Sequence, residues 1–166
     1  MDDTIEVVNA MYSNTEGQRA YGFEIEAEWD VTHQLELRSS FAWQHAERKD
    51  GGSRVGRAAG REFSFAANWK FIPLWNLNTQ VNWIGGRKQP SYDTRTQPDE
   101  LDNFTVVDLT LRKASQDKSW EFAVSAKNLF DKQYFEWGDT PPGSPDLGDY
   151  EMQGRSVYAE VSYQFR

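Results

Sequence analysis

Several features are missing from this sequence, and each absence excludes a class of protein. It has no cysteine, which excludes disulfides, thiolate metal sites and cysteine nucleophiles. No window approaches the roughly 20 apolar residues of a helical membrane span, so a helical membrane protein is excluded. Lys and Arg number 18 against 26 Asp and Glu, giving a net charge of −8 without any basic stripe, and this argues against a nucleic-acid partner.

The first residues, Met1 to Glu6, contain neither a positively charged leader nor an apolar segment. If the protein is exported, its targeting signal is missing from these 166 residues. We therefore expect a truncated chain.

Aromatic residues, in contrast, are plentiful. The hydrophobic fraction of 38% is low for a compact soluble core, yet 7 Trp, 7 Tyr and 10 Phe make the chain 14% aromatic. Membrane β-barrels have this composition, because half of each strand faces a polar lumen and aromatic girdles lie at both lipid interfaces.

Apolar and polar residues alternate with a period of two along most of the chain. The clearest run has apolar residues at every second position from Tyr21 to Trp29, with Gly22, Glu24, Glu26 and Glu28 between them. Such alternation predicts strands with one apolar and one polar face. Further strands are expected over residues 35–43, 63–71, 77–83, 107–111, 120–126 and 157–165, and a weaker one over 5–12. About eight strands of roughly ten residues have the length that crosses a bilayer at a tilt.

The connections between these strands alternate in length. Short turns are expected near residues 31, 73 and 116, and long polar loops near residues 54, 93 and 140. Short turns at one rim and long loops at the other are typical of an outer-membrane barrel. The sequence thus predicts an all-β, antiparallel, up-and-down transmembrane β-barrel fold with its long loops outside the cell.

The last strand has its own pattern. It is similar to the closing strand by which bacterial outer-membrane barrels are recognised and assembled, because an aromatic residue near the terminus follows spaced apolar residues; these residues are Val157, Ala159, Val161, Tyr163 and Phe165. Arg166, one residue past the aromatic, departs from that pattern. The expected partners of this strand are the barrel-assembly machinery and outer-membrane lipid.

Four segments resemble a known family. The segments Asn128–Tyr134 and Gly154–Tyr158, with the closing strand after them, look like the C-terminal end of TonB-dependent outer-membrane receptors, and Tyr21–Ala27 and Val106–Leu111 resemble segments that precede it. The resemblance implies active uptake of a scarce ligand, such as a ferric siderophore, haem, cobalamin or a glycan. It also implies a barrel of about 22 strands with an N-terminal plug that contacts an inner-membrane energy transducer. Residues 1–166 would then be the C-terminal segment of the barrel, without the plug and without the preceding strands.

Two alternatives are open. A self-contained eight-stranded outer-membrane barrel would have a structural or adhesive role, and a soluble small-ligand-binding barrel would turn its apolar faces inward. Charges argue against the small barrel, because acids outnumber bases on the predicted non-lipid face and a lumen filled by side chains would bury unpaired ions. The acids are Glu24, Glu26, Glu28, Glu36, Glu62, Asp108, Glu121 and Glu160, and the bases are Arg38, Lys70, Arg112 and Lys127. Large aromatics at the strand ends suit an interface belt better than an internal cavity.

Candidate ligand contacts lie in the outer loops, where aromatic and cationic side chains offer binding surface; they are Tyr92, Arg95, Tyr134, Phe135 and Trp137. No catalytic residue, cofactor or metal site is predicted, and His33 and His45 lack a ligand cluster. We expect the protein not to be an enzyme.

Two sets of polar residues are expected to have structural roles. The row of Glu24, Glu26 and Glu28 is predicted to be a solvated wall paired with Arg38 and Lys70, and Asn128 and Asp131 are predicted to shape a strand-to-loop transition.

Overall fold

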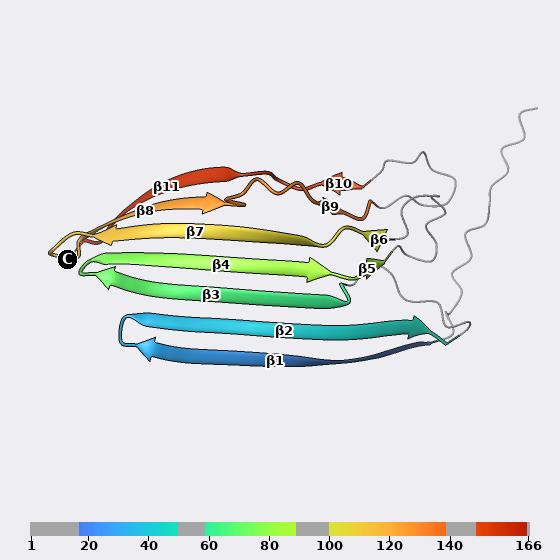
Figure 1. The fold of residues 1–166 in the computed structure, drawn as a ribbon. Helices are drawn as coiled ribbons and strands as arrows, with labels where there is room; N and C mark the ends of the chain where they lie inside the picture. Colours follow the sequence, from blue (N-terminus) through green and yellow to red (C-terminus); the bar gives the residue numbers. More distant parts are fainter. Residues whose placement is uncertain (1–16, 50–58, 89–99, 139–148, 166) are drawn as a thin grey trace, which may run out of the picture.

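The computed structural model describes residues 17–49, 59–88, 100–138 and 149–165, and these are all-β. Seven strands form one antiparallel sheet in sequence order (Figure 1): β1 (Gln18–Thr32), β2 (Leu35–Arg48), β3 (Arg61–Ile72), β4 (Trp75–Gly85), β7 (Phe104–Ala114), β8 (Trp120–Lys127) and β11 (Ser156–Tyr163). Two small hairpins accompany it, β5 (Arg87–Lys88) with β6 (Glu100–Leu101) and β9 (Phe135–Glu136) with β10 (Tyr150–Glu151). No helix in the described ranges is long and apolar enough to cross a membrane.

The seven long strands confirm the strands predicted from the alternating pattern, while the weak strand predicted over residues 5–12 lies outside the described part. The predicted difference between the connections is also confirmed. Figure 1 shows the short turns β1–β2, β3–β4 and β7–β8 at one end of the sheet, while the strand ends that the long connections join lie at the other end. The first and last strands of the sheet, β1 and β11, are not paired with each other in the described residues.

The short turns are built from local hydrogen bonds and from residues with positive φ. In the β1–β2 turn, the hydroxyl of Thr32 accepts the amide N–H groups of Gln34 and Leu35, each at 3.1 Å. Leu74 and Lys118 take φ angles of 68° and 58° in the next two turns. Such left-handed residues reverse the chain within very few residues.

The turn between β7 and β8 also holds an ionised carboxylate. Asp117 accepts hydrogen bonds from the hydroxyls of Ser115 and Ser119 and from the backbone N–H of Ser119. These donors, the Ser115 hydroxyl first, lower the pKa of Asp117 to about 2. The carboxylate is therefore ionised at neutral pH.

One face of the sheet is apolar and exposed. Register pairs such as Phe23 with Trp43 and Phe63 with Trp83 place apolar side chains side by side on it. Ile25 is 61% exposed, and no large side chain in the described ranges is fully buried. Among the described residues no second layer covers this surface, so it needs an apolar environment.

Aromatic side chains form two belts on the apolar face. One belt lies near the short turns and includes Trp29, Trp69, Phe71, Trp75, Trp120 and Tyr163; the other lies toward the long connections and includes Tyr21, Trp43, Phe63 and Trp83. Tyr21 and Trp29 are separated by the same number of residues as Trp75 and Trp83, which corresponds to roughly 27 Å along a strand. With a strand tilt near 40°, the height of the band between the belts is roughly 20 Å, close to the apolar band of an outer-membrane barrel.

The other face is polar and contains cross-strand hydrogen bonds. The hydroxyls of Ser40 and Ser64 are 2.8 Å apart, those of Thr110 and Ser125 are 2.9 Å apart, and the Nδ2 atom of Asn76 donates to the Oδ1 atom of Asn68 at 2.6 Å. Side chains of this kind suit a water-filled space better than a dry core.

Only part of the predicted charge pairing on β1 is confirmed. The guanidinium of Arg38 lies 3.2 Å from Glu28 and 2.6 Å from Glu36. Glu24 and Glu26 form no ion pair within the described residues, and neither does Lys70, so the predicted pairing with Lys70 is wrong for this part of the chain. Lys70 lies on β3, whereas the acids lie on β1 with β2 between them.

Candidate ligand-binding rim

The end of the sheet with the long connections carries the residues that could bind a ligand. We call this end the loop rim and define it by residues 85–88, 100–104, 128–138 and 149–155. Both small hairpins lie here, β5–β6 extending from β4 and β7 and β9–β10 extending from β8 and β11 (Figure 1). The two hairpins therefore extend beyond the ends of the long strands.

The chain enters the first hairpin through a glycine. Gly86 takes a φ of +66°, which favours glycine, and this turns the chain from β4 into β5. Its amide donates to the Oδ1 atom of Asn103 at 3.0 Å, and its carbonyl accepts the amide of Gly60 at 3.1 Å. These bonds fix Arg87, the next residue, relative to the neighbouring strands.

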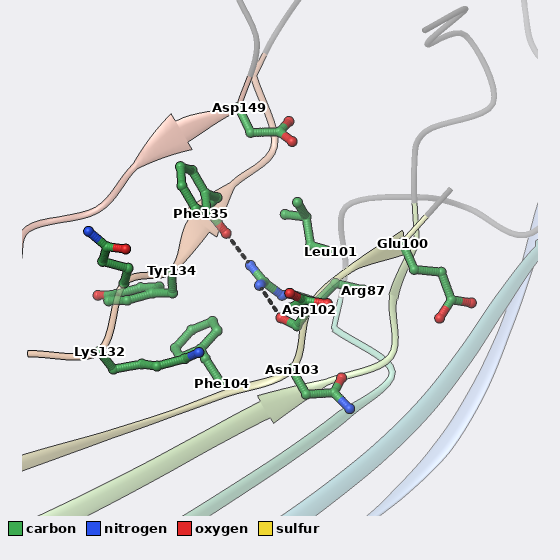
Figure 2. Close-up of a pocket in the computed structure, with 11 residues that line it drawn as sticks. Arg87, Glu100, Leu101, Asp102, Asn103, Phe104, Lys132, Tyr134, Phe135 and Asp149 are labelled. Carbon is green, nitrogen blue, oxygen red and sulfur yellow. Dashed lines mark hydrogen bonds between the residues drawn. The ribbon is translucent and has the colours of Figure 1, made fainter. Parts of the chain in front are cut away.

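Arg87 is the centre of the loop rim. Its side chain is only 3% exposed. Figure 2 shows its two terminal nitrogens donating to the carbonyl oxygens of Phe135 at 2.7 Å and Asp102 at 2.8 Å. The guanidinium also lies 3.2 Å from the carboxylate of Glu136 and 4.7 Å from the ring centroid of Phe104. Its Nε atom is buried without a hydrogen-bond acceptor among the described residues.

An aromatic pair lies beside this arginine. The rings of Phe104 and Tyr134 stack with centroids 4.2 Å apart and an interplanar angle of 26°. Together with Arg87 they line an open cavity of about 390 Å³, whose other described lining residues are Glu100, Leu101, Asp102, Asn103, Lys132, Gln133, Phe135 and Asp149 (Figure 2). A cavity lined by aromatic side chains and a few polar groups suits the recognition of a small molecule.

Asn128 anchors the start of the last long connection. It is 4% exposed and adopts a φ of +48°. Its backbone N–H donates to the carboxylate of Asp108 at 2.9 Å. Its side-chain Nδ2 donates to the carbonyl of Lys132, and its Oδ1 accepts the backbone N–H of Lys132, each at 2.9 Å. Asp131 in turn accepts the amide of Arg155 at 2.8 Å. The predicted structural role of Asn128 and Asp131 is confirmed, because they join the connection to β7 and to the entry of β11.

The predicted ligand contacts fall in different environments. Tyr134 is half-buried against Phe104, Phe135 is 42% exposed and Trp137 is 8% exposed. Tyr92 and Arg95 lie outside the described residues. The structure therefore brings Tyr134 and Phe135 together at the cavity.

Arg87 and Phe104 were not expected from the sequence to belong to this site. Arg87 follows two glycines in a polar segment, which indicated only a loop at the end of a strand. Its acceptors are backbone carbonyls, one of them 48 residues away. A backbone carbonyl is present at every residue, so no side-chain pattern could have identified the contact.

Within the described ranges, no group of three or more His, Asp or Glu side chains could hold a metal ion. The charge of Arg87 is engaged by protein oxygens rather than by solvent. Its chemistry therefore suits the positioning of the hairpins.

Comparisons with known proteins agree with this architecture. The family described as TonB dependent receptor-like, beta-barrel matches residues 2–129. The metal-pseudopaline receptor of Pseudomonas aeruginosa is 30% identical over 143 residues, covering 80% of this chain and 20% of that protein. An iron-regulated outer membrane virulence protein of Vibrio cholerae is 24% identical over 135 residues, covering 78% of this chain and 21% of that protein. The chain thus spans about a fifth of the length of these relatives.

Solved structures show the same fold. The ferripyoverdine receptor of the Pseudomonas aeruginosa outer membrane superposes with a TM-score of 0.72 at 18% identity, over 89% of this chain and 20% of that one. The ferric-catecholate import receptor of Escherichia coli in its closed form gives a TM-score of 0.75 at 17% identity, over 89% of this chain and 21% of that one. The family match, the relative at 30% identity and this shared fold lead to one conclusion: the chain belongs to the TonB-dependent receptor β-barrel family.

Proposed function

We propose that this chain is the C-terminal part of the barrel of a receptor that takes up a metal ion bound to a small organic chelator. The chain is an outer-membrane protein, as its family is. The observation that carries the proposal is the 30% identity, over 80% of this chain, to a receptor named for a metal–pseudopaline complex. The role is binding and transport rather than catalysis.

In this proposal residues 1–166 supply the C-terminal segment of a larger barrel. The remaining strands and the plug belong to other parts of the receptor, and the plug contacts the inner-membrane energy transducer. The open sheet, with β1 and β11 unpaired to each other in the described residues, supports this arrangement. So does the match to about a fifth of each relative's length.

The long connections would face the outside of the cell and the short turns the periplasm. The two aromatic belts then lie at the two membrane interfaces, where Trp and Tyr are favoured. The loop rim would meet the ligand first, through Tyr134 and Phe135 at the cavity, and Tyr92, Arg95 and Trp137 are further candidates from the sequence.

The closing strand would be recognised by the barrel-assembly machinery. Its apolar residues Val157, Ala159, Val161, Tyr163 and Phe165 occupy one face of β11 and its end, and Val157 and Phe165 are 67% and 86% exposed. This surface is available to a partner or to lipid.

Metal uptake by cells tests the proposal. Cells that carry or lack the full-length receptor would be given radioactive iron as hydroxamate, catecholate and carboxylate chelates, each with and without the energy transducer. We expect uptake of at least one chelate to require both proteins. If the receptor makes no difference to any chelate but its loss weakens adhesion or the cell envelope, a structural or adhesive barrel would replace the proposal.

A further inference from the structure

We propose that Arg87 is a positioning residue that joins the two outer hairpins, β5–β6 and β9–β10, into one unit and so sets the position of Tyr134 and Phe135. The link between the hairpins stands on the geometry alone. Its effect on ligand affinity rests on the proposed function.

Arg87 reaches segments that are far apart in the sequence. It belongs to β5, and its side chain donates to the carbonyl of Phe135 in β9, 48 residues along the chain. The same guanidinium donates to the carbonyl of Asp102, which lies between β6 and β7, and pairs with Glu136 of β9 at 3.2 Å. One side chain therefore holds both hairpins at the same time.

The planar guanidinium is suited to this position. Two carbonyls accept from its two terminal nitrogens at 2.7 and 2.8 Å, so the fork spans the gap between the hairpins. A lysine ammonium is a single point of charge and cannot reproduce the planar fork. The face of the Phe104 ring lies at 4.7 Å and adds a cation–π contact to the buried charge.

The hairpin held by Arg87 carries the candidate ligand contacts. Tyr134 precedes β9 and stacks on Phe104, and its carbonyl accepts the amide of Met152 at 3.0 Å. Phe135, whose carbonyl is bound by Arg87, is 42% exposed and lines the cavity. Fixing the backbone of Phe135 therefore restricts the positions that both rings can take at the cavity.

The test uses the full-length receptor with Arg87→Ala and Arg87→Lys. Lys88→Ala is the matched control, because the neighbouring Lys88 forms an exposed ion pair with Glu100 inside the first hairpin. Hydrogen exchange of the amides of residues 134–136 and 150–152 is measured after gel mobility has shown that the barrel is folded. Because Arg87→Ala removes two hydrogen bonds and an ion pair, we expect roughly tenfold or faster exchange at these amides. Arg87→Lys should show an intermediate increase and Lys88→Ala none.

Uptake separates positioning from stability. With the ferric chelate that wild-type cells take up best, Arg87→Ala should raise the half-saturating concentration and leave the maximal rate per folded receptor unchanged. A stability role alone would lower the number of receptors at an unchanged half-saturating concentration.

Unchanged exchange at residues 134–136 in a folded Arg87→Ala receptor would overturn the proposal, as would an equal effect of Lys88→Ala. If Arg87→Ala does not assemble, Arg87→Lys decides by the same criterion. Hydrogen exchange needs no ligand. A receptor that takes up no chelate would therefore refute the proposed function, while the exchange result would still test whether Arg87 joins the two hairpins.

Discussion

The assignment of the two sheet faces predicts a large difference between two arginine substitutions in neighbouring strands. Leu109 of β7 lies on the apolar face and pairs with Thr79 of β4, which is midway between Trp75 and Trp83. Leu109 is thus about 14 Å along the strand from each aromatic belt. That distance exceeds the length of an extended side chain, so Leu109→Arg would hold its charge near the bilayer midplane.

The expected cost of Leu109→Arg is about 2–4 kcal/mol, which lowers the folding equilibrium constant roughly 30- to 900-fold. Gln80→Arg is the control, because Gln80 is exposed on the polar face and lies opposite the carboxylate of Asp108. A surface change of this kind should alter the free energy of unfolding by less than about 0.5 kcal/mol.

Both changes in the free energy of unfolding are measured by denaturant titration of the full-length receptor in lipid vesicles. Gel mobility and protease protection report the folded fraction at each denaturant concentration. The reasoning would be refuted if Gln80→Arg were as costly as Leu109→Arg, or if Leu109→Arg assembled like the wild type. Such a result would place the apolar face inward, as in a soluble ligand-binding barrel.

Three further predictions concern the backbone and one carboxylate, each measured in the same vesicles. A Cβ atom at Gly22 would lie 2.3 Å from the carbonyl oxygen of Trp43, so Gly22→Val should destabilise the β1–β2 hairpin by about 1–3 kcal/mol; an unchanged denaturation midpoint would contradict it. Asn128→Ala should cost about 2–4 kcal/mol, since it loses buried hydrogen bonds and keeps a positive φ, and Asn128→Gly should cost less; equal losses would argue against backbone strain. The lowered pKa of Asp117 means that its stabilising effect is complete above its ordinary pKa of 3.8 and disappears as the pH falls toward about 2. The stability difference between wild type and Asp117→Asn should therefore shrink over that range, and a constant difference would count against the hydrogen-bond explanation.

The sheet could be predicted from the sequence because its physical cause is periodic. Apolar and polar residues alternate so regularly from Tyr21 to Trp29 that the two-residue period of a strand predicts the strand, its two faces and the short turn after it. Once one face is apolar, a slip of one residue would turn every side chain to the wrong side, so the pattern also fixes the register of β1 and β2.

The loop rim was only partly predictable. Aromatic residues in the last loop indicated Tyr134 and Phe135, but β5–β6 and β9–β10 are two residues long and have no period to detect. The contacts of Arg87 depend on carbonyl positions that exist only after folding. The positive φ of Asn128 was likewise invisible, although Asn is one of the few residues that tolerate it.

The unequal connections of the sheet have a consequence for how such a protein can change over time. Residues 49–60 join β2 to β3 and residues 128–155 join β8 to β11, a roughly twofold range of length within one sheet. Closure entropy grows only with the logarithm of loop length, so a twofold extension costs about 0.6 kcal/mol. The long connections should therefore gain or lose residues at little thermodynamic cost, whereas the turn at Thr32 to Leu35 should not, because it sets the register of two strands. We expect insertions and deletions to be tolerated mainly at the end of the sheet that carries the cavity.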